Sequence, residues 1–411
     1  MNRLKIKWIL LAFLFLTLLF FSNNGGLVDI EKTAIFKAIA VDIHDGKYAV
    51  TAQIAVPEAI DTNTEDQKTQ ITGYGSTVGS AIKNIGDMSG WYPQLAFCNL
   101  IVLGKSTLND NVIKLLDYFA KTLRIQDSAL VVLAEEKASE LLDVGTPLDN
   151  ISSIALQKKL LKNPGFDRDV ATNDIKTFCS GYYSKTGSSF MPIVKLVKPN
   201  LKNLENSENQ SSGLTGTNNI GDGSSKSSSS ESKTDNTFLF DTDTTALFKN
   251  GIKVGELDRE HTKIFNALTK NFKNSTLEIN NIKGEIYEKE HNYLLTILRC
   301  TPKMTMKVDT NQVKIIIDLN MYCKITDQDV EFSDSTYSKN TPLPASVSKK
   351  AEEQVRERIL AILETIRQTD CDILKIKDKI YKYHHKYYSR FKDNYLELLT
   401  SEINVKVTGQ K

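Results

Sequence analysis

The sequence lacks the short motifs that identify most enzymes. It has no G-x-S-x-G nucleophile elbow and no H-E-x-x-H, and the glycines of "GYGSTVG" (73–79) match neither common phosphate-binding spacing. That stretch is more typical of a turn before a capped helix. The five histidines include one adjacent pair, His384 and His385, whose side chains would point in different directions on a helix. We therefore expect no catalytic residue, no metal site and no cofactor.

Neither sign of charge is in excess, and cysteine is scarce. The 52 basic and 50 acidic side chains leave a net charge of +2, which argues against a nucleic-acid partner because such binding depends on clustered positive charge. No C-x-x-C occurs, so neither a zinc ribbon nor a thioredoxin-like pair is indicated. We do not expect a disulfide framework. We expect isolated thiols that pack as small hydrophobic side chains. The five cysteines are Cys98, Cys179, Cys300, Cys323 and Cys371.

One hydrophobic segment is long, and it lies at the N-terminus. A basic stretch ending at Lys7 precedes an apolar region from Trp8 to Phe21, and no further basic residue appears before Lys32. The positive-inside rule predicts that the first residues stay in the cytoplasm and that the chain beyond residues 1–26 is exported. The side chains expected to form the membrane anchor or signal region include Trp8, Leu11, Phe13, Leu16 and Phe21.

Whether this segment is removed is left open by the sequence. Residues 22–26 offer no convincing pair of small residues for signal peptidase, which favours a retained anchor, with cleavage as the alternative. As a helix, the segment would span roughly 21 Å, less than a hydrocarbon core of about 30 Å. Lysine snorkelling and local thinning of the bilayer would make up part of the difference.

A linker divides the rest of the chain. Residues 201–237 are rich in Ser, Asn and Gly and contain no aromatic residue, so they cannot bury enough apolar surface to offset their ordering entropy. They separate an N-terminal region, 27–200, from a C-terminal region, 238–411. The patterns predict a mixed α/β or α+β fold, with several small mixed sheets and packed helices in two or three subdomains.

Hairpin, helix and strand signals alternate through both regions. Asp45-Gly46 and Asn250-Gly251 are hairpin turn signals, and Ser76 or Thr77 caps a helix that ends near Gly90. The expected strands lie at 97–105, 128–135, 244–257, 284–290, 293–300, 312–325 and 403–409. The expected helices lie at 110–123, 137–144, 149–165, 260–271, 347–368 and about 372–398. The clearest is 347–368, with Val347, Ala351, Val355, Ile359, Ile362, Leu363 and Ile366 on one face.

The segment 375–392, "KIKDKIYKYHHKYYSRFK", mixes basic and aromatic residues. On the outer face of a membrane, such a segment could contact anionic head groups or a membrane partner. The alternative, which the helical spacing favours, is an ordinary exposed helix whose tyrosines and Phe391 cover the sheet.

The order of these segments resembles the C subunit of spore nutrient germinant receptors, a family found in endospore-forming bacteria. The resemblance is carried by the export signal, "AIAVDIHDGKYAVTAQIAVP", "NLIVLGK", "SALVVLAEEKASELL", "TALFKNGIKVGEL", the long helix and the closing "INVKVTG". Family members are usually lipoproteins anchored through a cysteine in a G-C-W-D type sequence. This chain has Gly26 about where that cysteine is expected, so lipidation there is not expected; a second departure is Ala40, where glycine is common.

The resemblance implies a non-enzymatic role beside A- and B-type subunits at the extracytoplasmic face of the spore inner membrane. That assembly senses nutrients and triggers germination. Two other classes stay open on the residues alone. One is a membrane-tethered extracytoplasmic protein that binds a small ligand by itself, and the other is an exported hydrolase that would need Glu135, Glu136 and His44 to converge in a cleft.

Overall fold

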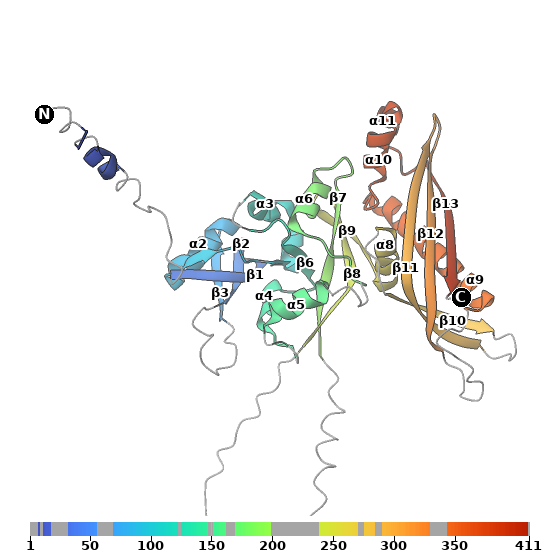
Figure 1. Ribbon diagram of the computed structural model, residues 1–411, viewed down its shortest axis with the longest axis horizontal. Helices are drawn as coiled ribbons and strands as arrows, with labels where there is room; N and C mark the ends of the chain where they lie inside the picture. The colour runs from blue at the N-terminus through green and yellow to red at the C-terminus, as the bar shows by residue number, and fades with distance from the viewer. Residues whose placement is uncertain are drawn as a thin grey trace, which may run out of the picture.

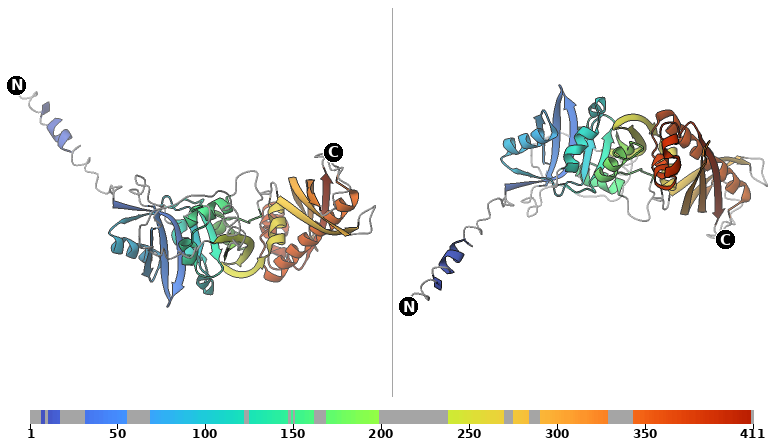
Figure 2. Two further views of the ribbon diagram at one scale, coloured as in Figure 1. Left: turned by 90° about the horizontal axis from the view of Figure 1, so that it is seen from below. Right: turned by 90° about the horizontal axis from the view of Figure 1, so that it is seen from above.

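The chain builds two β-sheets that lie one after the other along the long axis of the molecule (Figures 1 and 2). In this computed structural model, the structure describes residues 7–8, 11–17, 32–55, 69–121, 125–146, 149, 151–161, 169–198, 238–269, 275–283, 290–328 and 343–409. Helices pack against both sheets, so the expected mixed α+β class is confirmed.

The first sheet has nine strands in the order β3-β2-β1-β5-β6-β7-β8-β9, with β4 beside β1. Its centre is parallel, because β1, β5, β6 and β7 run in one direction, and its two flanks are antiparallel hairpins. The central strands β5 and β6 are buried at every residue, as parallel strands covered on both faces should be. The strands are β1 (Thr33–His44), β2 (Lys47–Ala55), β3 (Thr69–Gly75), β4 (Tyr92–Gln94), β5 (Leu100–Leu103), β6 (Leu130–Ala134), β7 (Ser188–Val197), β8 (Leu239–Lys249) and β9 (Ile252–Leu257).

Helices cover both faces of this sheet. One apolar core holds the buried sides of α2 (Val78–Ser89), α3 (Ile113–Lys121) and α6 (Ile175–Tyr182) against the strands. A second core, on the other face, holds α4 (Ala138–Asp143) and α5 (Ser152–Leu160). A short 3-10 helix, η3 (Lys105–Asn109), follows β5.

The predicted turns are confirmed. Asp45 and Gly46 have φ of 50° and 72°, and Asn250 and Gly251 have φ of 50° and 76°, the left-handed pair that a tight hairpin needs. Thr77 is the N-cap of α2: its hydroxyl accepts from the Ser80 N–H, and its own N–H donates to the Ser80 hydroxyl. The stretch 73–79 is therefore a turn before a capped helix.

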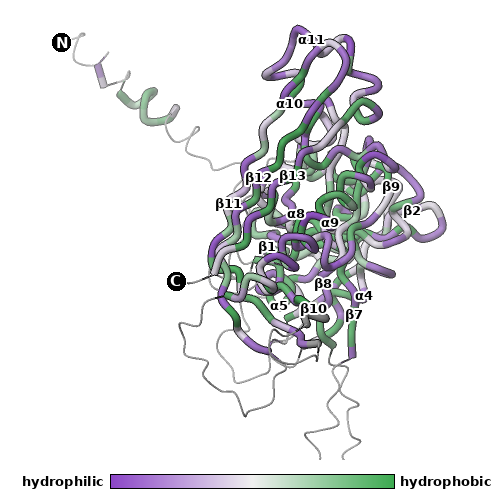
Figure 3. Tube along the Cα trace, turned by 90° about the vertical axis from the view of Figure 1, so that its right-hand side faces the viewer, coloured by the Kyte–Doolittle hydropathy of each residue, from purple (hydrophilic) through white to green (hydrophobic). Residues whose placement is uncertain are grey.

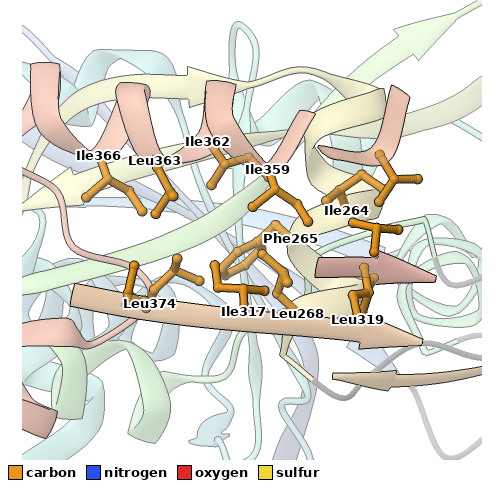
Figure 4. Packing of buried hydrophobic residues seen from close by; sticks show 14 of the residues in the cluster. Ile264, Phe265, Leu268, Ile317, Leu319, Ile359, Ile362, Leu363, Ile366 and Leu374 are labelled. Atoms are coloured by element: carbon orange, nitrogen blue, oxygen red, sulfur yellow. The ribbon is translucent and has the colours of Figure 1, made fainter. Parts of the chain in front are cut away.

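The second sheet has four strands, ordered β10-β11-β12-β13, packed against α9 and α8 (Figure 4). The seven α9 residues predicted to share one face are the seven that are buried. The elements are α8 (Arg259–Leu268), β10 (Ser275–Lys283), β11 (Glu290–Val308), β12 (Val313–Gln328), α9 (Ala345–Thr369) and β13 (Leu399–Gly409).

The prediction of one long helix at 372–398 is wrong. The structure has two short helices, α10 (Ile376–Tyr383) and α11 (His385–Phe391), which are separated at His384 where φ is −132°. Residues 371–374 are buried on every side, so they form a packed loop and not the amphipathic start of a helix. The chain then turns back to β13.

Other predictions were incomplete. The patterns gave no signal for β3, α6 and β7, and the strand expected at 284–290 falls almost wholly outside the described residues. The hairpin β8–β9 follows the linker in sequence but extends the first sheet by pairing with β7.

The N-terminal segment is helical where it is described, at residues 7–8 and 11–17. Trp8, Leu11, Phe13 and Leu16 are all more than half exposed, while Phe21 and Gly26 lie outside the described residues. Within the described part of the chain, no helix is both long and apolar enough to cross a membrane.

Candidate functional site: the junction between the two sheets

The two sheets meet at a loop that leaves α9 and enters α10, and we call residues 370–374 the junction loop. Asp370 ends α9 in the left-handed conformation, with φ of 50°, which Asp tolerates better than most residues. Its carboxylate lies 2.9 Å from Nζ of Lys249, the last residue of β8. The turn that ends α9 therefore also ties the helix to the first sheet.

Cys371 continues this connection from inside the protein. Its side chain is fully buried, and its thiol donates to the Phe248 carbonyl at 3.2 Å. Burial raises the pKa of the Cys371 thiol to about 12, so the group stays protonated and acts as a donor rather than as a nucleophile.

Asp372 is the buried acid of the junction loop. Its Oδ2 accepts from the Lys377 N–H at 2.8 Å and from the Tyr395 hydroxyl at 3.1 Å, while Oδ1 has no partner among the described residues. Burial raises the pKa of this carboxyl, and the hydrogen bonds from the start of α10 and from Tyr395 oppose that shift only in part. Lys379 lies nearby, and burial lowers the pKa of its ammonium group.

The junction is apolar as well as polar. The Phe190 ring of β7 meets the Phe265 ring of α8 edge to face, with centroids 4.9 Å apart. Leu247 of β8 belongs to the same buried cluster as Ile317 and Ile359 from the second sheet and its helix. Figure 4 shows part of this cluster, with α8 side chains lying between α9 and the strands. The core of the second sheet therefore continues onto the edge of the first.

Further contacts extend the junction on either side. The Lys185 N–H, before β7, donates to Asp378 of α10 at 2.9 Å. The Ser275 hydroxyl, at the start of β10, donates to Asp169 at 2.7 Å. The β7–β8 ladder adds strands of the C-terminal region to the first sheet, and these two hydrogen bonds tie the two regions together further.

The residues considered for hydrolase chemistry are not brought together. Glu135 lies 2.9 Å from Lys195 and Glu136 lies 2.8 Å from Lys105, each as an ion pair at the surface. The nearest ionic partner of His44 is its neighbour Asp45, at 3.7 Å. Among the described residues, no ion pair joins His44 to either of these acids.

The remaining sequence candidates behave as structural residues. All five cysteines are free, and four are buried, as expected of thiols that act as small hydrophobes. His385 lies in ring contact with Tyr381 and Tyr388. Among the described residues, no group of three His, Cys, Asp or Glu side chains gathers as metal ligands would.

A groove of about 600 Å³ lies between α5 and β8. Its volume falls within the range of small-ligand pockets. Its charged lining is largely paired within the protein: Lys158 lies 2.5 Å from Asp149, and Arg259 pairs with Asp243. No sequence pattern indicated this groove, because its two walls are far apart in the chain.

Two family models match this chain. A family model described as the spore germination protein N-terminal domain matches residues 27–196, and one described as spore germination B3/GerAC like, C-terminal, matches residues 243–410. The chain belongs to this family of spore germination proteins. Its likeness to the germinant receptor C subunit, drawn from the order of segments, is thereby confirmed.

One solved structure supports the fold of this GerAC-type chain. It is described as the crystal structure of the GerBC protein, with a TM-score of 0.51 and 16% sequence identity. The alignment covers 93% of this chain and 100% of that chain. At this identity the likeness concerns the fold alone. No curated protein matched the sequence.

The GerAC C-terminal match begins at residue 243, inside β8. The C-terminal family region therefore contributes most of a hairpin to the first sheet. The junction is formed largely by this hairpin and by the loop after α9. Sequence reasoning missed it because nothing local marks which sheet a hairpin will join.

Proposed function

We propose that this chain is the non-enzymatic extracytoplasmic subunit of a nutrient germinant receptor, and that it works by assembling with membrane A- and B-type subunits at the spore inner membrane. The observation that carries the proposal is the pair of family matches, which together span residues 27–196 and 243–410.

The junction supports a role in assembly rather than in catalysis. An edge-to-face pair of Phe190 and Phe265 joins the two sheets, and the β7–β8 ladder joins the N-terminal and C-terminal regions of the chain within the first sheet. The acid inside the junction, Asp372, is fully buried and accepts from a backbone N–H and a tyrosine hydroxyl. A chain built this way presents a large surface of fixed shape to partners, which is what a receptor subunit needs.

Membrane attachment is part of the proposal. The hydrophobic side chains Trp8, Leu11, Phe13 and Leu16 are exposed on the N-terminal helix, and Phe21 continues the hydrophobic segment in the sequence. Exposed apolar side chains of this size favour a lipid environment. With glycine at position 26, attachment falls to this segment or to the partner subunits.

Co-purification from spore membranes tests the assembly directly. A chain carrying an affinity tag after Lys411 would be extracted in mild detergent and captured. A- and B-type subunits should be recovered with it, and they should be absent from captures of an untagged strain. Repeated capture of the chain alone, from membranes that contain both partners, would contradict the proposal.

The second candidate function is solitary binding of a small ligand, and the groove beside α5 is the observation that favours it. A ligand that binds only the folded chain raises its unfolding temperature by mass action. Saturable stabilisation by a nutrient, without any partner and abolished by Asp241→Ala in the groove lining, would support this second function. The assembly proposal predicts no such stabilisation.

A further inference from the structure

The tip, which we define as residues 375–392, consists of α10, α11 and the basic residue at each end. It stands at one end of the second sheet, beside the turn between β11 and β12 (Figures 1 and 3). Ile376, Ile380 and Phe391 are buried and hold it to the core. Most of its other side chains are exposed, so the tip offers a surface, although Lys377 and Asp378 at its base also contact the junction.

Positive charge gathers on this surface. The tip has seven basic residues and one acidic residue, a net charge of +6, although the whole chain carries only +2. The rest of the chain therefore carries a net charge of −4. Five of the tip cations are exposed. Among the described residues, only one of these five, Lys392, forms an ion pair: its Nζ lies 3.9 Å from Oδ2 of Asp393. The other four, without an ion pair there, are Lys375, Lys382, Lys386 and Arg390.

Tyrosine accompanies this charge. Tyr383 is 67% exposed and Tyr381 is 40% exposed, and the Tyr381 ring packs edge to face on Tyr388 at 4.9 Å. Lys382 lies 5.1 Å above the Tyr383 ring, which places an ammonium group beside an amphipathic ring. The large aliphatic residues of the tip, by contrast, are buried. Phe391 is buried, as the helical spacing predicted, but Tyr381 and Tyr383 are exposed and do not cover the sheet.

From this arrangement we propose that the tip binds the anionic headgroups of a phospholipid bilayer. Exposed lysines and an arginine attract anionic lipid, and tyrosine places its ring at the level of the headgroups with its hydroxyl in water. A protein interface of comparable strength would need a well-packed desolvated centre. The tip offers instead solvated cations on a protruding pair of helices. The contact is additional to the hydrophobic N-terminal segment, and it does not depend on assembly with partner subunits.

A fluorescent reporter placed on the tip tests the proposal in the full chain. Ser389 is exposed, whereas the native thiols are mostly buried with raised pKa values, so Ser389→Cys can be labelled selectively. The labelled chain would be reconstituted into vesicles of phosphatidylcholine, alone or mixed with phosphatidylglycerol. The N-terminal segment attaches the chain to both vesicle types, and the reporter reads only the surroundings of the tip. The tip reporter should shift to a less polar environment only when phosphatidylglycerol is present, and high salt should reverse the shift.

Neutralising the tip should abolish that shift. Each basic residue near an anionic surface contributes on the order of fivefold in affinity, so Lys382→Gln, Lys386→Gln and Arg390→Gln together should weaken lipid binding by about a hundredfold. The exchange Lys382→Arg, Lys386→Arg and Arg390→Lys keeps the charge and should keep the shift.

The matched control removes the same charge elsewhere. Lys349→Gln, Lys350→Gln and Arg356→Gln alter exposed residues in the first half of α9, whereas the tip follows the end of that helix, and should leave the shift intact. A reporter that responds equally to both vesicle types would overturn the proposal. So would a response that appears only when A- or B-type subunits are added, because the tip would then be a protein interface.

Discussion

The junction loop and the tip are neighbours in sequence but opposite in environment. In the junction loop, Cys371 and Asp372 are fully buried and bonded to the first sheet and to Tyr395. In the tip, Lys382, Tyr383 and Lys386 face solvent. A few residues therefore separate a buried segment that joins the two sheets from a segment that is exposed to solvent. We therefore expect substitutions in the junction to change the stability of the fold, and substitutions in the tip to change binding without changing stability.

Phe265→Ala should have the largest effect on stability. It removes a fully buried ring that packs on Phe190 across the junction, and truncations of buried phenylalanine cost about 3–5 kcal/mol. Denaturant unfolding of the full chain would measure the loss. Tyr383→Ala is the control, because it removes an exposed ring of similar size from the tip. Equal losses in the two variants would erase the contrast between junction and tip.

Asp372→Asn should change the pH dependence of stability. The folded-state pKa of Asp372 is raised above its ordinary 3.8, so the unfolded chain gives up this proton more readily. The wild-type chain should therefore lose stability as the pH rises from about 3.8 through the raised pKa. The loss should be about 1.4 kcal/mol for each pH unit that separates the folded-state pKa from the unfolded-state pKa. The Asn variant should lack this loss.

Thermal unfolding of both chains across that pH range gives the comparison. Tyr395→Phe is the matched variant, because it removes the hydroxyl that donates to Asp372 Oδ2; the pKa of Asp372 should then rise further, and the loss should be larger and extend to higher pH. Parallel pH profiles for the wild-type chain and the Asn variant would show that the carboxyl is not buried as described.

The pair formed by Lys249 and Asp370 should contribute less. Its lysine is 19% exposed and its aspartate is 65% exposed, and such partly exposed pairs contribute about 0.2–1 kcal/mol. A double-mutant cycle with Lys249→Gln and Asp370→Asn would give the coupling energy, and Asn keeps a residue that tolerates the left-handed turn. The coupling should shrink at high salt. A coupling of several kcal/mol would make this ion pair, and not the apolar contact, the main tie between the sheets.

The tip should have the smallest effect on folding. The combined change Lys382→Gln, Lys386→Gln and Arg390→Gln alters exposed side chains that lack ion pairs within the described chain. Such surface changes usually shift stability by less than about 0.5 kcal/mol each. The unfolding midpoint should stay close to that of the wild-type chain. A large drop would mean that the tip side chains contribute to packing, and that the tip differs less from the junction than their exposure indicates.

Local patterns predicted local structure well. The stripe on α9 and the turn at Asn250-Gly251 follow from helical periodicity and from left-handed turn preference, and both are present. The break at His384 was missed because the basic and aromatic composition of 372–398 is compatible with one helix. Nothing in the local sequence says that residues 371–374 will be buried from every side.

The junction could not be predicted, because it depends on contacts between distant residues. Asp372 meets Tyr395 and Cys371 meets Phe248 only after the two sheets have formed. Similarly, the sequence suggested that a hairpin forms around Asn250, but the sheet that it joins is decided by its pairing with β7.

Germination of spores that lack this chain is the most direct test of the account. The strain should also lack paralogous receptors, so that no other receptor answers the nutrient. The account predicts that the nutrient response is lost, that a non-nutrient trigger still works, and that the wild-type chain restores the response. A nutrient response in this strain that equals the response of the strain carrying the chain would contradict a role in a germinant receptor.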